Sequence, residues 1–183
     1  MDNSEKASKI RLLIVDIDGV MTNGKIYTGA TGEMFKAFDV KDGLGLKMLM
    51  RNGISVAVIT AKSSAIVAQR MAGLGVEDVF QGVSDKAAKF HELIAAKGLA
   101  PEECAYIGDD LPDIAVMALV GLSAAPSDAT ELIRERADIV STKAGGAGCV
   151  REIAEFILKS QSLYEKTLEA MFFHPDTASR FKY

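Results

Sequence analysis

The chain has 183 residues, of which 49% are hydrophobic and 25% are charged, and its formal net charge is -4 at pH 7. These values are typical of one globular domain with a substantial core, and they exclude a disordered or fibrous chain. The acidic balance argues against non-specific binding of nucleic acid, and no apolar run approaches the roughly 20 residues that span a bilayer.

The first strong signal follows residues 1–9, which we expect to be flexible. Residues 12–20 read LLIVDIDGV, an apolar run that suits a strand buried on both faces and that ends in Asp16 and Asp18. Open parallel sheets bind ligands outside the carboxyl ends of their strands, so this pair lies where α/β enzymes hold their active sites. The alternative for this segment taken alone is that the two carboxylates only cap a turn before Gly19.

The segment of residues 25–38 reads KIYTGATGEMFKAF, and its two alternating runs around a glycine-containing turn predict a β-hairpin. After it, short apolar runs alternate with longer segments of helical period. The predicted strands are residues 54–60, 78–81, 104–107, 121–124 and 137–140, and the predicted helices are residues 42–52, 63–73, 85–97, 112–120, 127–135 and 149–160. This alternation predicts a single α/β domain with a doubly wound parallel sheet.

Residues 161–183 form the predicted C-terminal tail of this domain. Six of its side chains recur near helical spacing: Leu163, Tyr164, Thr167, Leu168, Met171 and Phe172. They predict an apolar helix face that packs against its own subunit or against a neighbouring one. The N-terminus lacks the apolar core of a signal peptide, and Cys104 and Cys149 lack metal-ligand spacing, so we expect a reduced, cytoplasmic protein.

Chemically active residues recur at the ends of the predicted strands. Thr60 ends the second strand, beside a helix start whose backbone amides attract anions. Lys86 starts a later helix, where the helix dipole disfavours a cation, so a phosphate or Asp16 would account for its position. The segment YIGDDLPD crowds Asp109, Asp110 and Asp113 together, and a divalent cation would relieve their repulsion.

The order Asp-x-Asp, Thr, Lys, Gly-Asp-Asp resembles the four motifs of the haloacid dehalogenase superfamily of phosphohydrolases. The resemblance implies that Asp16 is the nucleophile and Asp18 the general acid and base, with Thr60 and Lys86 on the phosphate oxygens. It also implies Mg²⁺, held by Asp16, by Asp109 and by the backbone carbonyl of Asp18, with Asp110 or Asp113 anchoring the site behind them. A receiver domain is the rival signalling class, but the order of its motifs differs, and a catalytically idle assembly module of the same fold is a second rival.

The gaps between the motifs leave no room for a cap domain. The hairpin, the segment GEMFKAFDVKDGLGLK and the late AGGAGCVRE resemble a cap-less family that hydrolyses 3-deoxy-D-manno-octulosonate 8-phosphate during the synthesis of lipopolysaccharide precursors. In that family four subunits assemble around the hairpins, so we expect a homotetramer in which a neighbouring subunit covers the site. The expected partner is a small sugar-acid phosphate, with no nucleic acid and no membrane.

The same resemblance assigns substrate contacts along the chain. The implied substrate-binding residues are Asp18, Asp39, Val40, Lys41, Asp42, Gly43, Lys47, Lys62, Arg70 and Lys86. The chain departs from the family pattern of Asn at Asp39, of Gly at Ala61 and of Arg at Lys41, Lys47 and Lys62. Because lysine lacks the planar fork of arginine, a nine-carbon 2-keto sugar acid 9-phosphate is the alternative substrate.

Overall fold

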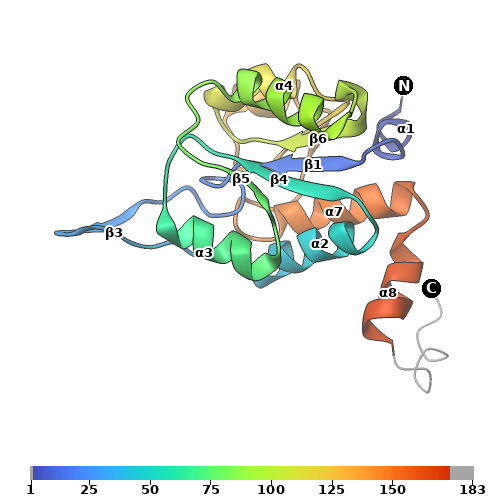
Figure 1. The fold of residues 1–183 in the computed structure, drawn as a ribbon, viewed down its shortest axis with the longest axis horizontal. Helices are drawn as coiled ribbons and strands as arrows, with labels where there is room; N and C mark the ends of the chain where they lie inside the picture. Colours follow the sequence, from blue (N-terminus) through green and yellow to red (C-terminus); the bar gives the residue numbers. More distant parts are fainter. Residues whose placement is uncertain (1, 174–183) are drawn as a thin grey trace.

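The computed structural model describes residues 2–173, and its main feature is a six-stranded sheet in the order β5-β4-β1-β6-β7-β8 (Figure 1). The strands are β1 (Leu12–Val15), β4 (Ser55–Ile59), β5 (Asp78–Phe80), β6 (Cys104–Ile107), β7 (Leu122–Ala125) and β8 (Ile139–Val140). All neighbouring strands run parallel. The chain extends the sheet on one side of β1 and then returns to build the other side, which confirms the predicted doubly wound fold.

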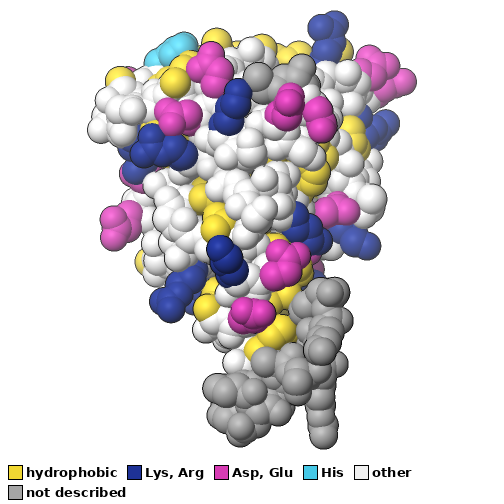
Figure 2. Space-filling model, turned by 90° about the vertical axis from the view of Figure 1, so that its right-hand side faces the viewer, with side chains coloured by type: hydrophobic (Ala, Val, Ile, Leu, Met, Phe, Trp, Pro, Cys, Tyr) yellow, Lys and Arg dark blue, Asp and Glu magenta, His cyan; other side chains and the backbone are white. Residues whose placement is uncertain are grey.

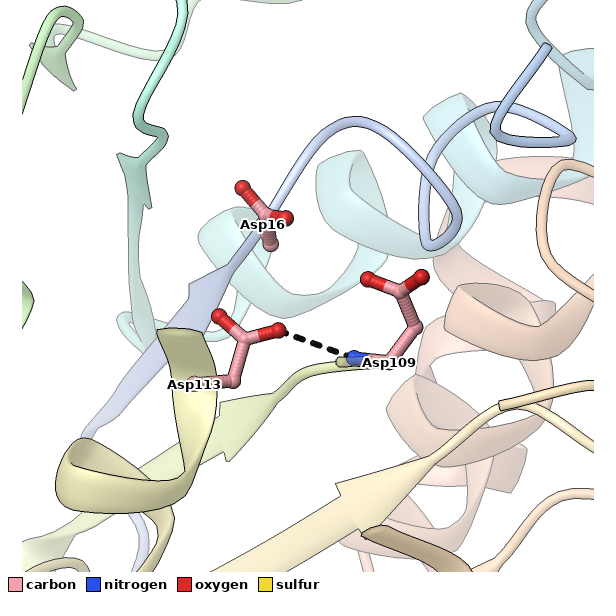
Figure 3. Close-up of side chains that lie close together, drawn as sticks. All are labelled: Asp16, Asp109 and Asp113. Carbon is pink, nitrogen blue, oxygen red and sulfur yellow. Dashed lines mark hydrogen bonds between the residues drawn. The ribbon is translucent and has the colours of Figure 1, made fainter. Parts of the chain in front are cut away.

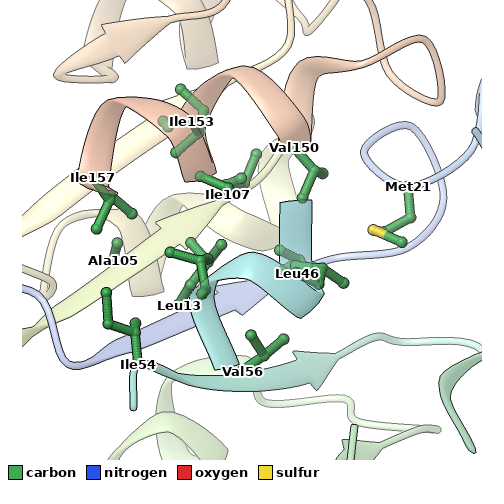
Figure 4. Packing of buried hydrophobic residues seen from close by; sticks show 14 of the residues in the cluster. Leu13, Met21, Leu46, Ile54, Val56, Ala105, Ile107, Val150, Ile153 and Ile157 are labelled. Atoms are coloured by element: carbon green, nitrogen blue, oxygen red, sulfur yellow. The ribbon is translucent and has the colours of Figure 1, made fainter. Parts of the chain in front are cut away.

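Helices cover both faces of this sheet (Figure 1). On one face lie α2 (Val40–Arg51), α3 (Ala65–Leu74) and α7 (Cys149–Ser160), and on the other lie α4 (Lys86–Lys97), α5 (Ile114–Met117) and α6 (Glu131–Arg136). Alternate β1 side chains supply the two cores: Leu13 packs with the α2 and α7 side, where Leu46 and Ile153 meet it, and Leu12 packs with the α4 side (Figure 4). The apolar run of β1 is therefore buried on both faces, as predicted.

The predicted hairpin forms from β2 (Tyr27–Gly29) and β3 (Gly32–Phe35), and it projects away from the layered body (Figure 1). Stacking of Tyr27 on Phe35, with ring centroids 4.3 Å apart, joins its strands. Two apolar side chains near its tip and base stay in solvent, with Met34 63% and Ile26 62% exposed. The hairpin thus presents apolar surface that its own chain does not cover.

The prediction of a flexible N-terminus is wrong for the residues that the structure describes. Helix α1 (Asn3–Ala7) starts with a capping box between Asp2 and Glu5. The Lys6 ammonium lies 2.5 Å from the carboxylate of Asp138, and the Asn3 side-chain amide donates to the Asp138 carbonyl at 2.7 Å. Because Asp138 is remote in the sequence, no local pattern announces this anchoring.

Two predicted helices are shorter than their patterns indicate. The predicted helix at residues 112–120 is split into a 3₁₀ turn, η2 (Leu111–Asp113), followed by α5. The predicted helix at residues 127–135 starts only at Glu131, because residues before it bind elsewhere: the Ser127 amide donates to the Lys143 carbonyl, and the Asp128 carboxylate accepts from the Gly145 amide. A second 3₁₀ turn, η1 (Pro101–Glu103), precedes β6.

The tail begins with α8 (Tyr164–Phe172), which packs against its own subunit through Leu168 and through a hydrogen bond from the Asn52 amide to the Thr167 hydroxyl at 2.8 Å. Phe172 stays 47% exposed. Residues 174–183 of the predicted tail lie outside the described residues.

On the face in Figure 2, basic and acidic side chains are interspersed rather than gathered by sign. Within residues 2–173, no helix has both the length and the apolar character to cross a membrane.

Candidate active site

The predicted motif residues meet at the carboxyl edge of the sheet. Asp16 follows β1, Thr60 follows β4, Asp109 lies two residues beyond β6, and Lys86 is the first residue of α4. The strands are parallel, so their carboxyl ends share one edge, and β1 lies where the strand order reverses. Chain segments up to about 90 residues apart in sequence are thereby brought to one place.

Three carboxylates form the centre of the site (Figure 3). One oxygen from each of Asp16, Asp109 and Asp113 lies within 4.8 Å of the others. Burial raises the pKa of Asp16 to about 6, although Lys86 lowers it. Burial and the carboxylates of Asp113 and Asp16 raise the pKa of Asp109 to about 7. This cluster therefore holds more negative charge than one lysine offsets, which is the condition that a divalent cation would relieve.

Hydrogen bonding separates the three carboxylates into two kinds. Asp113 accepts from the Tyr106 hydroxyl at 2.6 Å, from the Lys86 ammonium at 2.7 Å, and from the backbone amides of Asp109 and Asp110 at 3.0 and 3.3 Å. A carboxylate has about four acceptor positions, so Asp113 is fully engaged. The buried Oδ1 of Asp16, by contrast, accepts no hydrogen bond from the described residues.

The site thus fits Mg²⁺, with Asp16 and Asp109 as the carboxylates free to hold it. Gly19 leaves them room, because a Cβ there would lie 2.0 Å from an oxygen of Asp109 and because its φ of +91° is unfavourable for other residues. The sequence left either Asp110 or Asp113 as the residue that supports the metal ligands from behind. The structure favours Asp113, because the Asp110 carboxylate instead caps η2 through the Leu111 amide.

Lys86 is the buried cation of the site, with 5% of its surface exposed. Its ammonium lies 2.7 Å from Asp113 and 3.1 Å from Oδ1 of Asp16, the latter at an ion-pair distance without hydrogen-bond geometry. Burial alone would lower the pKa of Lys86, but the charges of Asp16 and Asp113 and the hydrogen bond to Asp113 raise it by more, so the pKa lies above its ordinary value. These carboxylates explain why a lysine is stable at the start of a helix.

Asp18 lies beside the hairpin, and this contact was not predicted. The Lys36 ammonium is 2.5 Å from Oδ1 of Asp18 and 3.1 Å from Glu33, while Lys62 lies 3.8 Å from Oδ2 of Asp18. Glu33 also accepts a hydrogen bond from the hydroxyl of Ser64 at the start of α3. The sequence signal was weak, because Lys36 lies within the predicted hairpin at residues 25–38 and the alternation there does not show which residue its side chain meets.

The residues predicted to contact substrate fall into two groups. Exposed side chains on α2 and before α3 are available to a ligand: Val40, Lys41, Lys47 and Lys62. Asp42, in contrast, is fully buried and accepts the backbone amides of Gly148 and Arg151 at 3.2 and 2.8 Å. It therefore stabilises the start of α7, which is a structural contact that the resemblance did not indicate.

Asp39, Gly43 and Arg70 also have contacts within the chain. The carboxylate of Asp39 caps α2 through the Lys41 amide at 2.7 Å. Gly43 is covered by Arg70, because a Cβ at Gly43 would lie 2.5 Å from a guanidinium nitrogen. The guanidinium carbon is 5.8 Å from the ring centroid of Phe38, and the buried Nε of Arg70 has no hydrogen-bond partner among residues 2–173. Arg70 is therefore the one buried side-chain donor of this region left open.

Comparison with known proteins identifies relatives over most of the chain. The haloacid dehalogenase-like hydrolase family matches residues 64–153. The 3-deoxy-D-manno-octulosonate 8-phosphate phosphatase of Yersinia pestis is 46% identical over 164 residues, which cover 90% of this chain and 88% of that protein. The crystal structure of the Yersinia pestis enzyme has a TM-score of 0.88 and covers 90% of this chain and 89% of its own.

A second solved structure carries ligands. It is the 3-deoxy-D-manno-octulosonate 8-phosphate phosphatase of Moraxella catarrhalis in complex with magnesium, phosphate and KDO. Its identity to this chain is 39%, with a TM-score of 0.89, and the match covers 91% of this chain and 96% of that one. The resemblance found in the motifs is therefore confirmed over the whole layered body.

Proposed function

We propose that this chain, which belongs to the haloacid dehalogenase-like hydrolases and within them to the 3-deoxy-D-manno-octulosonate 8-phosphate phosphatases, is a phosphoric monoester hydrolase that converts this eight-carbon sugar-acid phosphate to the free sugar acid and phosphate. The observation that carries the proposal is the group of Asp16, Asp109 and Lys86 at the switch point of the sheet, with Asp18 two residues beyond Asp16 in the chain. It combines a nucleophile, a cation site and a phosphate-binding lysine.

The reaction proceeds in two displacements at phosphorus. Asp16 attacks in line and forms an aspartyl-phosphate, while Asp18 donates a proton to the departing sugar oxygen. Asp18 then takes a proton from the water that hydrolyses the aspartyl-phosphate. Thr60 and Lys86 hold the equatorial oxygens of the transferred group. Bound Mg²⁺, held by Asp16, Asp109 and the backbone carbonyl of Asp18, supplies positive charge that offsets the repulsion between carboxylate and phosphate.

The cations around the site favour a substrate that carries an acidic sugar. Lys62 and Arg70, whose buried Nε has no hydrogen-bond partner among residues 2–173, lie on the α3 side, and Lys41 and Lys47 are exposed on α2. A substrate with both a phosphate and a carboxylate gives these four cations a purpose. Asp39, Val40 and Gly43 contribute the surface between them, and Asp42 contributes indirectly by fixing α7.

The substrate assignment is tested by comparing phosphate release from the eight-carbon 8-phosphate and from a nine-carbon 2-keto sugar acid 9-phosphate, each with Mg²⁺. We expect the higher kcat/KM for the eight-carbon substrate. Asp16→Asn, which keeps the shape of the side chain, is the matched control and abolishes turnover. A preference for the nine-carbon substrate would reassign the enzyme, and absence of Mg²⁺-dependent turnover with either one, or with p-nitrophenyl phosphate, would favour the idle assembly module.

The assembly proposed here is a homotetramer built around the hairpin. Its support is the exposed apolar surface of Ile26, Met34 and Phe35, which are 62%, 63% and 49% exposed. Light scattering after gel filtration tests it: wild type has four times the monomer mass, and Met34→Lys dissociates. A monomeric wild type would refute the assembly. The buried free thiols of Cys104 and Cys149 suit a cytoplasmic enzyme.

A further inference from the structure

Tyr106 is a fully buried phenol that the reaction above does not use. It lies on β6, with its ring in the core between the sheet and α4, together with Ile14 and Phe90. Its hydroxyl donates to Oδ1 of Asp113 at 2.6 Å and lies 3.4 Å from the Lys86 ammonium. The other strand residues around it are apolar, and a phenylalanine would fill the same space. The hydroxyl therefore calls for an explanation in terms of Asp113.

Asp113 has two possible roles in this site. Its carboxylate lies within 4.8 Å of the oxygens of Asp16 and Asp109, so on distance alone it would be a third metal ligand. It is instead the acceptor that holds Lys86, at 2.7 Å. The two backbone amides of Asp109 and Asp110 fix Oδ2, while Tyr106 and Lys86 share Oδ1. Of these four donors, Tyr106 is the only one that a single side-chain substitution removes without removing a charge.

We propose that Tyr106 is a positioning residue whose hydroxyl keeps the Asp113 carboxylate on Lys86 and prevents it from turning to the divalent cation held by Asp16 and Asp109. The inference rests on the proposed phosphatase function for its kinetic part only. A third carboxylate on the cation would hold it more tightly and would draw Lys86 away from the phosphate oxygens. The Tyr106 hydroxyl therefore favours turnover over tight binding of the metal.

The test is Tyr106→Phe, which removes the hydroxyl and retains the ring. We expect kcat to fall about tenfold, equivalent to about 1.4 kcal/mol, with KM unchanged, because Lys86 loses its orientation. Calorimetric titration of the substrate-free protein with MgCl₂ alone is expected to give several-fold tighter binding. Unchanged or weaker Mg²⁺ binding would overturn the proposal, and so would an unchanged kcat.

Two further variants separate this role from core packing. Asp113→Asn cannot supply a third carboxylate, so adding Tyr106→Phe to it changes kcat and Mg²⁺ affinity less than twofold, whereas independent effects would multiply and refute the coupling. We also expect Asp113→Asn alone to bind Mg²⁺ no more tightly than wild type. This measurement does not require Tyr106→Phe to fold. Tyr164→Phe, in α8, is the control and changes neither quantity.

The two proposals fail in different ways. If wild type hydrolyses p-nitrophenyl phosphate but not the eight-carbon substrate, the substrate assignment fails, while the Mg²⁺ titration still decides the role of Tyr106. If wild type hydrolyses the eight-carbon substrate and Tyr106→Phe binds Mg²⁺ as wild type does, only the inference about Tyr106 fails.

Discussion

The variant Asp42→Ala tests whether Asp42, which the resemblance assigns to substrate binding, instead has a structural role. Its fully buried carboxylate accepts the amides of Gly148 and Arg151 at 3.2 and 2.8 Å. A hydrogen bond to a charged group contributes about 1.5–3 kcal/mol, and loss of a helix cap costs about 1 kcal/mol. Burial raises the pKa of Asp42, so the cost of burying its charge offsets part of this gain. We therefore expect Asp42→Ala to lower the free energy of unfolding by about 2–3 kcal/mol.

The assay is thermal unfolding beside steady-state kinetics. At this chain length about 1 kcal/mol corresponds to roughly 2–4 °C, so Asp42→Ala is expected to melt roughly 5–10 °C below wild type. KM of the folded variant stays within about twofold, because no catalytic group is removed. Asp39→Ala, which removes an exposed cap with one amide contact, is the control and costs about 1 kcal/mol. An unchanged melting temperature with a large rise in KM would refute the reasoning and make Asp42 a substrate contact.

Three further predictions follow from the charges. The folded-state pKa values of Asp16 and Asp109, about 6 and about 7, lie above the ordinary 3.8, so the metal-free protein loses stability as the pH rises from about 4 to 7. The rise in melting temperature that Mg²⁺ causes is expected to grow over the same pH range. A rise that does not depend on pH would contradict this prediction. Lys36→Met is expected to lower kcat/KM about fivefold without lowering the melting temperature, and unaltered kinetics would remove Lys36 from the site. Asp138→Ala removes the contacts that hold α1 and lowers the free energy of unfolding by about 1 kcal/mol at pH 7. Burial would raise the pKa of Asp138, but Lys6 and Ser123 lower it overall, so this loss of stability shrinks as the pH falls below about 4. Melting scans that show no such trend would refute the ion pair.

The sheet and the motif residues were predictable because their signals are local. β1 is an uninterrupted apolar run, so its burial on both faces follows from its sequence. Asp16, Thr60 and Lys86 each stand at the end of such a run or at a helix start, and parallel strands bring these ends together. The hairpin was predictable for the same reason, since its alternation and its turn glycine lie within one short segment.

The remaining features depend on partners that are distant in sequence. The pairing of Lys36 with Asp18 requires the path of the hairpin over the site, which no local pattern contains. The cap that Asp42 forms on α7 involves residues more than 100 positions away. The difference between Asp113 and Asp16 rests on counting hydrogen-bond donors in three dimensions, because in the sequence both are only acidic residues that follow an apolar strand.

The most direct test of the central claim is the identification of the phosphorylated residue. The protein is mixed with Mg²⁺ and with 3-deoxy-D-manno-octulosonate 8-phosphate labelled in its phosphate, quenched within one turnover, and reduced with borohydride, which converts an aspartyl-phosphate to homoserine. We predict label on the protein during turnover and homoserine at position 16. Label on another residue, or release of phosphate with no labelled protein and with Asp16 unreduced, would contradict the account.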